Sequence, residues 1–201
     1  MSRRARHGFT VIETLVFSSI LLLLMGCIVL VVQAGMRYAR KGTAYQDAQK
    51  QVLVSMRRMV EDFATGTPVR KDPTVLNDSN HIIFAAPIPD DPAGPWLYKD
   101  SNLLFQAWVA FYEDTTTEEL VRVRQPFTAP LLSGEVPFAP LLTDMEADPA
   151  KRILAKGVKE FSLNDGPNTN LISIKLSVGV ATGTNRFTTV TSQTMAEIPN
   201  L

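Results

Sequence analysis

The chain has 201 residues with 20 basic and 20 acidic side chains, so its formal net charge is zero. Nothing in this balance argues for binding to nucleic acid, and we expect no nucleic-acid partner. Its single cysteine, Cys27, excludes an internal disulfide, so a folded domain must be held by its hydrophobic core.

A short basic leader, residues 1–8, precedes a long apolar run, residues 9–32. A helix of that length spans about 36 Å at ~1.5 Å per residue, enough to cross a hydrocarbon core of about 30 Å. Arg3, Arg4 and Arg6 favour a cytoplasmic N-terminus. In a bacterium with two membranes, we therefore expect a single-pass inner-membrane protein whose C-terminal domain lies in the periplasm.

Glu13 is the one charged residue inside the apolar run. A carboxylate in a membrane span costs about 2.5 kcal/mol or more on insertion scales, so it normally has a cationic partner or a function. We expect Glu13 to meet a positive group.

The order Gly8-Phe9-Thr10-x-x-Glu13 ahead of an apolar helix resembles the signature of type IV prepilins and of their relatives, the pseudopilins of type II secretion. The resemblance implies that a prepilin peptidase cleaves between Gly8 and Phe9 and N-methylates the Phe9 amine. It also implies that Glu13 meets that amine, in its own or a neighbouring subunit, as helices stack in a filament. Pairing two costly buried charges would favour one register of assembly.

Other N-terminal segments fit these residues less well. A secretory signal peptide has an apolar region of only 7–15 residues, shorter than this run. Leu24-Met25-Gly26-Cys27 looks like a lipoprotein box that would acylate Cys27, but the chain stays apolar through Val32. A membrane-anchored binding domain that never enters a filament is a further alternative.

Residues 33–64 continue as an amphipathic helix. Apolar side chains recur every three or four residues, with charged ones between them. The stripe, which we expect to pack on a sheet, consists of Tyr45, Ala48, Val52, Met56, Met59 and Phe63. The charged residues expected on the other faces are Arg40, Lys41, Asp47, Lys50, Arg57, Arg58, Glu61 and Asp62. A coiled-coil seam is the alternative, although the stripe is short for one. Gly66 and Pro68 end the helix.

Residues 65–201 read as an antiparallel β domain, which gives a pilin-like α+β fold: a long helix packed on a sheet. Proline-rich loops separate the expected strands, and the second such segment, residues 126–142, is apolar enough to lie against the domain. We expect strands at 81–86, 103–112, 119–125, 171–180 and about 186–193, with a further apolar run at 153–163.

Alternation predicts which side chains face inward. In the 103–112 strand, Phe105, Ala107, Val109 and Phe111 share one face, and Gln106, Trp108 and Tyr112 share the other. Exposed Trp108 and Tyr112 are candidate partner contacts, although aromatic residues here could equally pack under the helix. In the following strand, Val121 and Val123 point inward and Arg122 and Arg124 outward.

The C-terminal part adds a weaker likeness. Leu154, Gly157, Val158, Phe161 and Leu163, followed by a hairpin with a strongly alternating second strand, resemble the J-type minor pseudopilins and related minor pilins.

Little in the chain points to catalysis or to a cofactor. Beyond the leader the only histidine is His81, which we interpret as a surface residue at a strand edge, and common catalytic motifs are missing. Acidic residues at 113–114, 118–119 and 144–148 could supply calcium ligands, but solvated turns explain them better. We therefore expect no enzyme activity, no cofactor and no metal.

The sequence thus predicts a minor pseudopilin of the type II secretion pseudopilus, with a minor pilin of a type IV pilus, serving adhesion, motility or DNA uptake, as the alternative. The partners implied are a prepilin peptidase, other pseudopilins or pilins, an inner-membrane assembly platform and membrane lipid.

Overall fold

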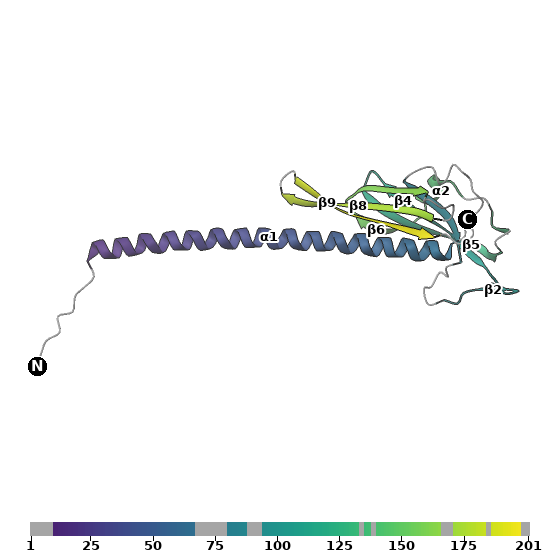
Figure 1. Cartoon of the computed structure of the whole chain (residues 1–201), viewed down its shortest axis with the longest axis horizontal. Coiled ribbons are helices and arrows are strands. Elements are labelled where there is room, and N and C mark those ends of the chain that lie inside the picture. Colours follow the sequence, from purple (N-terminus) through teal and green to yellow (C-terminus); the bar gives the residue numbers. More distant parts are fainter. Residues whose placement is uncertain are drawn as a thin grey trace, which may run out of the picture. The chain divides into compact units, whose positions relative to one another are not determined.

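The computed structural model describes residues 10–66, 80–87, 94–132, 135–137, 140–165, 171–183 and 186–197. The chain forms two compact units, Met1–Thr43 and Ala44–Leu201. Helix α1 (Val11–Thr65) contributes its N-terminal part to the first unit and its C-terminal part to the second (Figure 1). Both helical segments expected from the sequence are therefore confirmed as helix.

The described part of the first unit is Thr10 and the beginning of α1. Every side chain from Thr10 to Thr43 is exposed, and an 18-residue window of α1 has a mean hydropathy of 3.0. Within the described residues, α1 is the one helix long and apolar enough to cross a membrane.

In the second unit, α1 buries one face against β-strands. The buried residues are Ala48, Val52, Ser55, Met56, Met59, Asp62 and Phe63. The expected apolar stripe is thus confirmed from Ala48 onward. Tyr45 is a correction: it is 42% exposed, because the buried face begins one turn later. Asp62 is a second correction, since it is buried instead of solvated.

A four-stranded antiparallel sheet with the order β1-β4-β5-β6 packs against this helix. The strands are β1 (His81–Ala86), β4 (Phe105–Asp114), β5 (Glu119–Leu131) and β6 (Arg152–Lys156). The expected β4–β5 hairpin is confirmed, with a tight turn in which Glu118 has a positive φ of 54°. β5 runs six residues further than the alternation predicted.

Both faces of this sheet are buried. On the helix side, Phe84 and Phe111 pack with Phe63 of α1, at ring-centroid distances of 5.1 and 5.7 Å from Phe63. These rings belong to a larger cluster of buried residues between α1 and the strands, which we call the helix-side core. The opposite face carries a second set, the outer core, made of Ala85, Phe105, Trp108, Ala110, Tyr112, Val121, Val123 and Met145.

The two faces of β4 and β5 correct three expectations. Trp108 and Tyr112, expected outside or under the helix, are only 5% and 2% exposed and lie on the face away from the helix-side core. Phe105 lies with them and not with Val109, because the register shifts between Phe105 and Ala107. Arg122, expected in solvent, is 8% exposed and points to Asp62.

The second proline-rich segment was expected to lie against the domain, and three of its described apolar residues, Phe127, Val136 and Leu142, pack on the outer core, whereas Leu141 is exposed. Phe127 stacks edge-on against Trp108 at 5.6 Å, and Val136 and Leu142 pack beside it. Met145, from the short helix α2 (Leu142–Glu146), is fully buried there.

The apolar run at 153–163 is two strands, not one. It turns at Gly157, whose φ of 68° suits a residue without a side chain. β7 (Val158–Asp165) then begins a second antiparallel sheet, β7-β8-β9, with β8 (Leu171–Gly183) and β9 (Arg186–Glu197). The alternating residues Ile172, Ile174, Leu176, Val178 and Val180 are all buried in the helix-side core, as predicted.

A separate two-stranded piece, β2 (Tyr98–Lys99) with β3 (Asn102–Leu103), turns through Asp100 and Ser101 at positive φ. The α+β class is therefore confirmed: a long apolar helix together with antiparallel sheets.

Candidate functional site

The expected cleavage and methylation residues, Gly8 and Phe9, lie outside the described residues. The described chain begins at Thr10, immediately before α1. Glu13, the third residue expected to act there, lies in the first turn of α1.

Glu13 turns back toward the start of its own helix. The Thr10 N–H donates to Glu13 Oε2 at 2.9 Å, and the Thr10 hydroxyl donates to the same oxygen at 2.9 Å. The Glu13 N–H lies 3.3 Å from Thr10 Oγ1. Thr10 at the N-cap and Glu13 three residues later thus form a capping box, in which each side chain serves the backbone N–H of the other. The carboxylate is thereby fixed at the N-terminal end of α1.

The capping role of Thr10 was missed in the sequence. The signal was present, because Thr-x-x-Glu directly before an apolar run is the pattern of a capping box. The capping box gives Glu13 a second role, in addition to the charge pairing that the prepilin resemblance implies.

Polar side chains in the rest of the apolar part of α1 bond to the helix itself. The hydroxyl of Thr14 donates to the Thr10 carbonyl, Ser18 to that of Thr14, and Ser19 to that of Val16, at 2.8–3.2 Å. Such back-bonding satisfies these hydroxyl groups within the helix itself. Cys27 lies within the length of α1, away from both of its ends, and its side chain is exposed.

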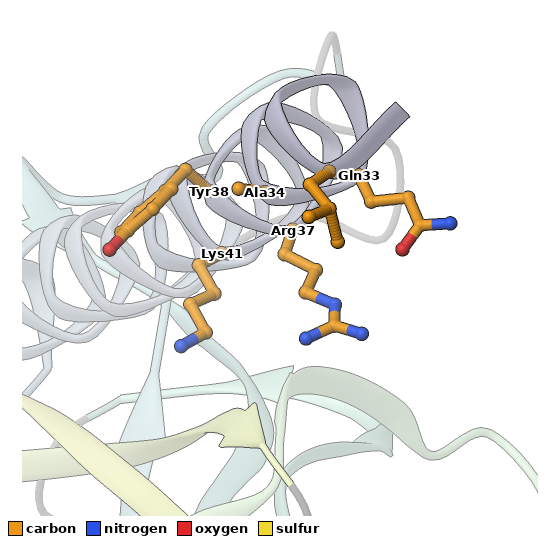
Figure 2. A pocket seen from close by; sticks show the side chains of 6 residues that line it. Gln33, Ala34, Arg37, Tyr38 and Lys41 are labelled. Atoms are coloured by element: carbon orange, nitrogen blue, oxygen red, sulfur yellow. The ribbon is translucent and has the colours of Figure 1, made fainter. Parts of the chain in front are cut away.

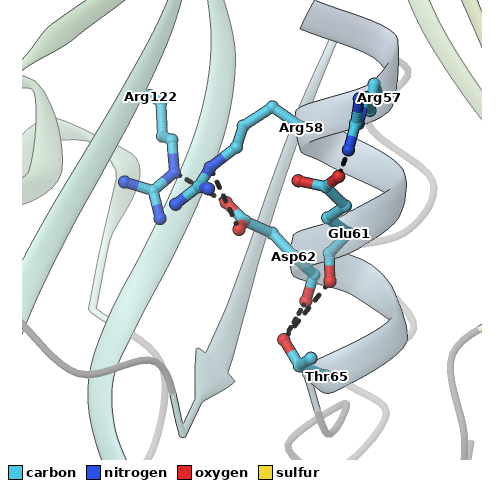
Figure 3. Close-up of polar contacts among 6 residues, drawn as sticks. All are labelled: Arg57, Arg58, Glu61, Asp62, Thr65 and Arg122. Atoms are coloured by element: carbon cyan, nitrogen blue, oxygen red, sulfur yellow. Dashed lines mark hydrogen bonds and ion pairs between the residues drawn. The ribbon is translucent and has the colours of Figure 1, made fainter. Parts of the chain in front are cut away.

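Asp62 and Arg122 form the buried polar link between α1 and the four-stranded sheet (Figure 3). Arg122 Nε donates to Asp62 Oδ2 at 2.6 Å, and Arg58 Nε lies 3.3 Å from Asp62 Oδ1. Burial raises the pKa of the Asp62 carboxyl, while Arg122 and then Arg58 act to lower it. The alternation rule missed this link because it assigns charged residues to solvent.

Two hydrogen bonds to β6 continue the link. The Ser55 hydroxyl donates to the Leu154 carbonyl at 3.1 Å, and Gln51 Oε1 accepts the Lys156 N–H at 3.0 Å. The helix thus satisfies backbone groups of the strand at the edge of the sheet.

The acidic residues of the β4–β5 turn that were considered as calcium ligands have other contacts. Glu118 pairs with Lys159 and Glu119 with Lys156. Glu113 accepts the Phe161 N–H at 3.2 Å. Asp114 caps the hairpin turn by accepting the N–H groups of residues 116 and 117, which lowers the pKa of its carboxyl. Among the described residues, no group of three or more His, Cys, Asp or Glu side chains could hold a metal ion.

His81 begins β1, which is an edge strand of its sheet, as expected. Its side chain is half-buried, with Nδ1 3.4 Å from Asn80 Oδ1, and it is therefore less exposed than the expected surface residue.

Comparison of the chain with models of protein families, with curated proteins and with solved structures gives no significant match.

Proposed function

We propose that this chain is a membrane-anchored, pilin-like filament subunit that is processed between Gly8 and Phe9 and assembled through α1. Its favoured identity is a minor pseudopilin of type II secretion. The observation that carries the proposal is the order Gly8-Phe9-Thr10-x-x-Glu13 at the start of a long, exposed, apolar helix. It acts in protein–protein assembly and performs no chemistry of its own.

The N-terminal part of α1 has the surface that such assembly needs. Its side chains from Val11 to Val32 are apolar apart from Glu13 and the back-bonded hydroxyls, and all are exposed. A helix of this kind is stable in lipid and equally able to pack against apolar helices of other subunits.

The capping box supports a role for Glu13 at this end of the span. Hydrogen bonds from Thr10 hold the carboxylate beside the residue that cleavage would make the new N-terminus. A carboxylate fixed there is positioned for an incoming ammonium group, and each charge lowers the cost of burying the other.

The single cysteine favours the secretion pseudopilus over the type IV pilus. Many filament-forming pilins close a C-terminal loop with a disulfide, which this chain cannot do because Cys27 lies in α1. A minor pilin of a type IV pilus is the second candidate, and co-purification with either set of subunits separates the two.

Processing is tested by the N-terminus and the intact mass of the protein from membranes that contain a prepilin peptidase. The expected product begins at Phe9 and carries one added methyl group. A Gly8→Val variant should remain uncleaved and serves as the control. A chain that keeps Met1, or one that begins at a lipidated Cys27, contradicts the proposal.

The role of Glu13 in assembly is tested by three variants. Glu13→Gln keeps a side chain that can complete the capping box but removes the charge, Glu13→Ala removes both, and Thr10→Ala removes the cap while keeping the charge. We expect both Glu13 variants to be cleaved yet absent from the sheared filament fraction, and Thr10→Ala to assemble. Normal assembly of the Glu13→Gln variant would show that Glu13 acts only as a helix cap and that its charge is not needed.

A further inference from the structure

We propose that the segment of α1 just beyond the apolar run binds the phosphate of an anionic phospholipid. The site, here called the basic collar, consists of Arg37, Tyr38, Arg40 and Lys41. The inference rests on the proposal that α1 spans a membrane, and it is independent of filament assembly.

The position of the collar along α1 matches the headgroup layer. A bilayer about 40–45 Å thick with a core of about 30 Å leaves roughly 5–8 Å of headgroups on each side. Arg37 lies five residues beyond Val32, which is about 7.5 Å along the axis at ~1.5 Å per residue. Lys41 lies one turn further along α1. Its ammonium group can still reach the headgroup layer, because a long basic side chain can extend back toward the interface.

The surface of α1 at this level forms a hollow with an apolar and a cationic end. It is lined by Leu30, Gln33, Ala34, Arg37, Tyr38 and Lys41. Figure 2 shows the charged ends of Arg37 and Lys41 extending to the same side of the helix, with the small Ala34 nearby. Leu30 suits an acyl chain and the two cations suit a phosphate. Tyr38, which is 76% exposed, is of the type enriched at membrane interfaces.

The charges of the collar are not balanced along the helix. No acidic residue lies three or four positions from Arg37, Arg40 or Lys41, and no acid occurs between Glu13 and Asp47. Arg37 and Lys41 are instead a like-charged pair at i, i+4, which destabilises a helix. An anion between them removes this repulsion, and a guanidinium group can bind phosphate through two parallel hydrogen bonds.

Leader removal would increase the importance of the collar. Arg3, Arg4 and Arg6 all lie before Gly8, so a chain cut after Gly8 keeps flanking basic side chains only on the outer side of the span. The collar is then the electrostatic contact that holds the processed subunit at the outer leaflet before it moves into a filament.

Native mass spectrometry of the full chain in a neutral detergent tests the site, with phosphatidylglycerol and phosphatidylcholine as the added lipids. Each basic side chain near an anionic lipid surface contributes about fivefold to binding. We expect Arg37→Gln/Lys41→Gln to weaken phosphatidylglycerol binding at least tenfold. The matched control, Lys50→Gln/Arg57→Gln, removes one lysine and one arginine further along α1 and should change binding less than twofold. Gln keeps helix propensity in both variants.

Three results would overturn the proposal: equal binding of the two lipids by the wild-type chain, unchanged binding by Arg37→Gln/Lys41→Gln, or displacement of the lipid by inorganic phosphate alone, which would mark a site for the free anion. Arg37→Lys keeps the charge and should retain most of the binding. The lipid-binding measurement involves neither cleavage nor assembly. The lipid proposal can therefore be wrong while the filament proposal holds, and the filament proposal can be wrong while lipid binding is found.

Discussion

Arg122 on β5 donates through Nε to Asp62 on α1 at 2.6 Å, and both side chains are buried between the helix and the sheet. The pair is separated by 60 residues of chain, so it forms only when the helix is docked. A buried carboxylate without a cation is costly, and this contact therefore helps to specify how helix and sheet meet.

Replacing Arg122 with Met should destabilise the domain by about 3–5 kcal/mol, because Asp62 would remain buried without its main partner. The double variant Asp62→Leu/Arg122→Met should recover most of that loss. Denaturant unfolding of the full chain in detergent, followed by near-UV circular dichroism, measures both. The control is Arg57→Met, whose ion pair with Glu61 is exposed and should contribute little. Equal losses in the single and double variants would contradict this role for the pair.

The loss in Arg122→Met should shrink as the pH falls. Burial raises the pKa of Asp62 in the folded protein above its unfolded value of about 3.9, and losing Arg122 raises it further. Below that raised pKa the folded state holds a neutral carboxyl, which needs no cation, so its penalty is relieved. Comparing the free energies of unfolding of the variant and the wild type at pH 7 and pH 5 checks the sign. A deficit that grows at pH 5 would show that Asp62 is not the group responsible.

Gly66→Ala should destabilise the domain by about 1–3 kcal/mol, the usual range for overpacking. An added Cβ would lie 2.5 and 2.8 Å from ring carbons of Phe84. That ring cannot move aside freely, because it packs between Phe63 and Phe111. Gly42→Ala is the matched control: its Cβ would meet nothing within 4 Å, and Ala improves helix propensity by about 1 kcal/mol. Thermal unfolding should therefore shift in opposite directions for the two variants.

Met145→Ala should cost about 2–5 kcal/mol, although it lies on a five-residue helix, because its side chain fills the centre of the outer core. Trp108 lies in the same core, so its fluorescence should shift to longer wavelength. Glu146→Ala, an exposed neighbour, is the control. Neither change should affect the proposed cleavage between Gly8 and Phe9, which intact mass checks.

Asp114→Ala should weaken the β4–β5 turn by about 1 kcal/mol at neutral pH, through the loss of two N–H partners. Because those hydrogen bonds lower its pKa in the folded state, the contribution of Asp114 is present above pH ~4 and disappears as the pH falls through that lowered value. Wild type and variant should converge in acid. NMR titration of the carboxyl gives the direction of the shift independently.

Local patterns were enough to predict the long helix and the main strands, but not the short elements β2 and α2 or the faces of β4 and β5. The period of the helix and the alternation of β8 follow from side-chain geometry, and both predictions are confirmed. Trp108 and Arg122 were misplaced for one reason: alternation assumes that a strand has a solvent side, whereas β4 and β5 are covered on both faces.

The strand order and the buried ion pair could not be predicted from the sequence, because both depend on pairings between distant segments of the chain. β1 pairs with β4 across a proline-rich loop, and Asp62 meets Arg122 only through that arrangement. Two local signals were readable but overlooked: the Thr10–Glu13 capping box, and Gly157, which marks the change from one sheet to the next.

The existence of two separate cores on one sheet has a consequence for how such a domain can diversify. The helix-side core ties α1 to seven strands, whereas the outer core joins only β1, β4 and β5 to the covering segment and α2. The exposed side chains described between residues 126 and 146 can therefore be exchanged or recharged with little effect on helix docking. Proteins that share this layout could present different outer surfaces while keeping the same packing of helix on sheet.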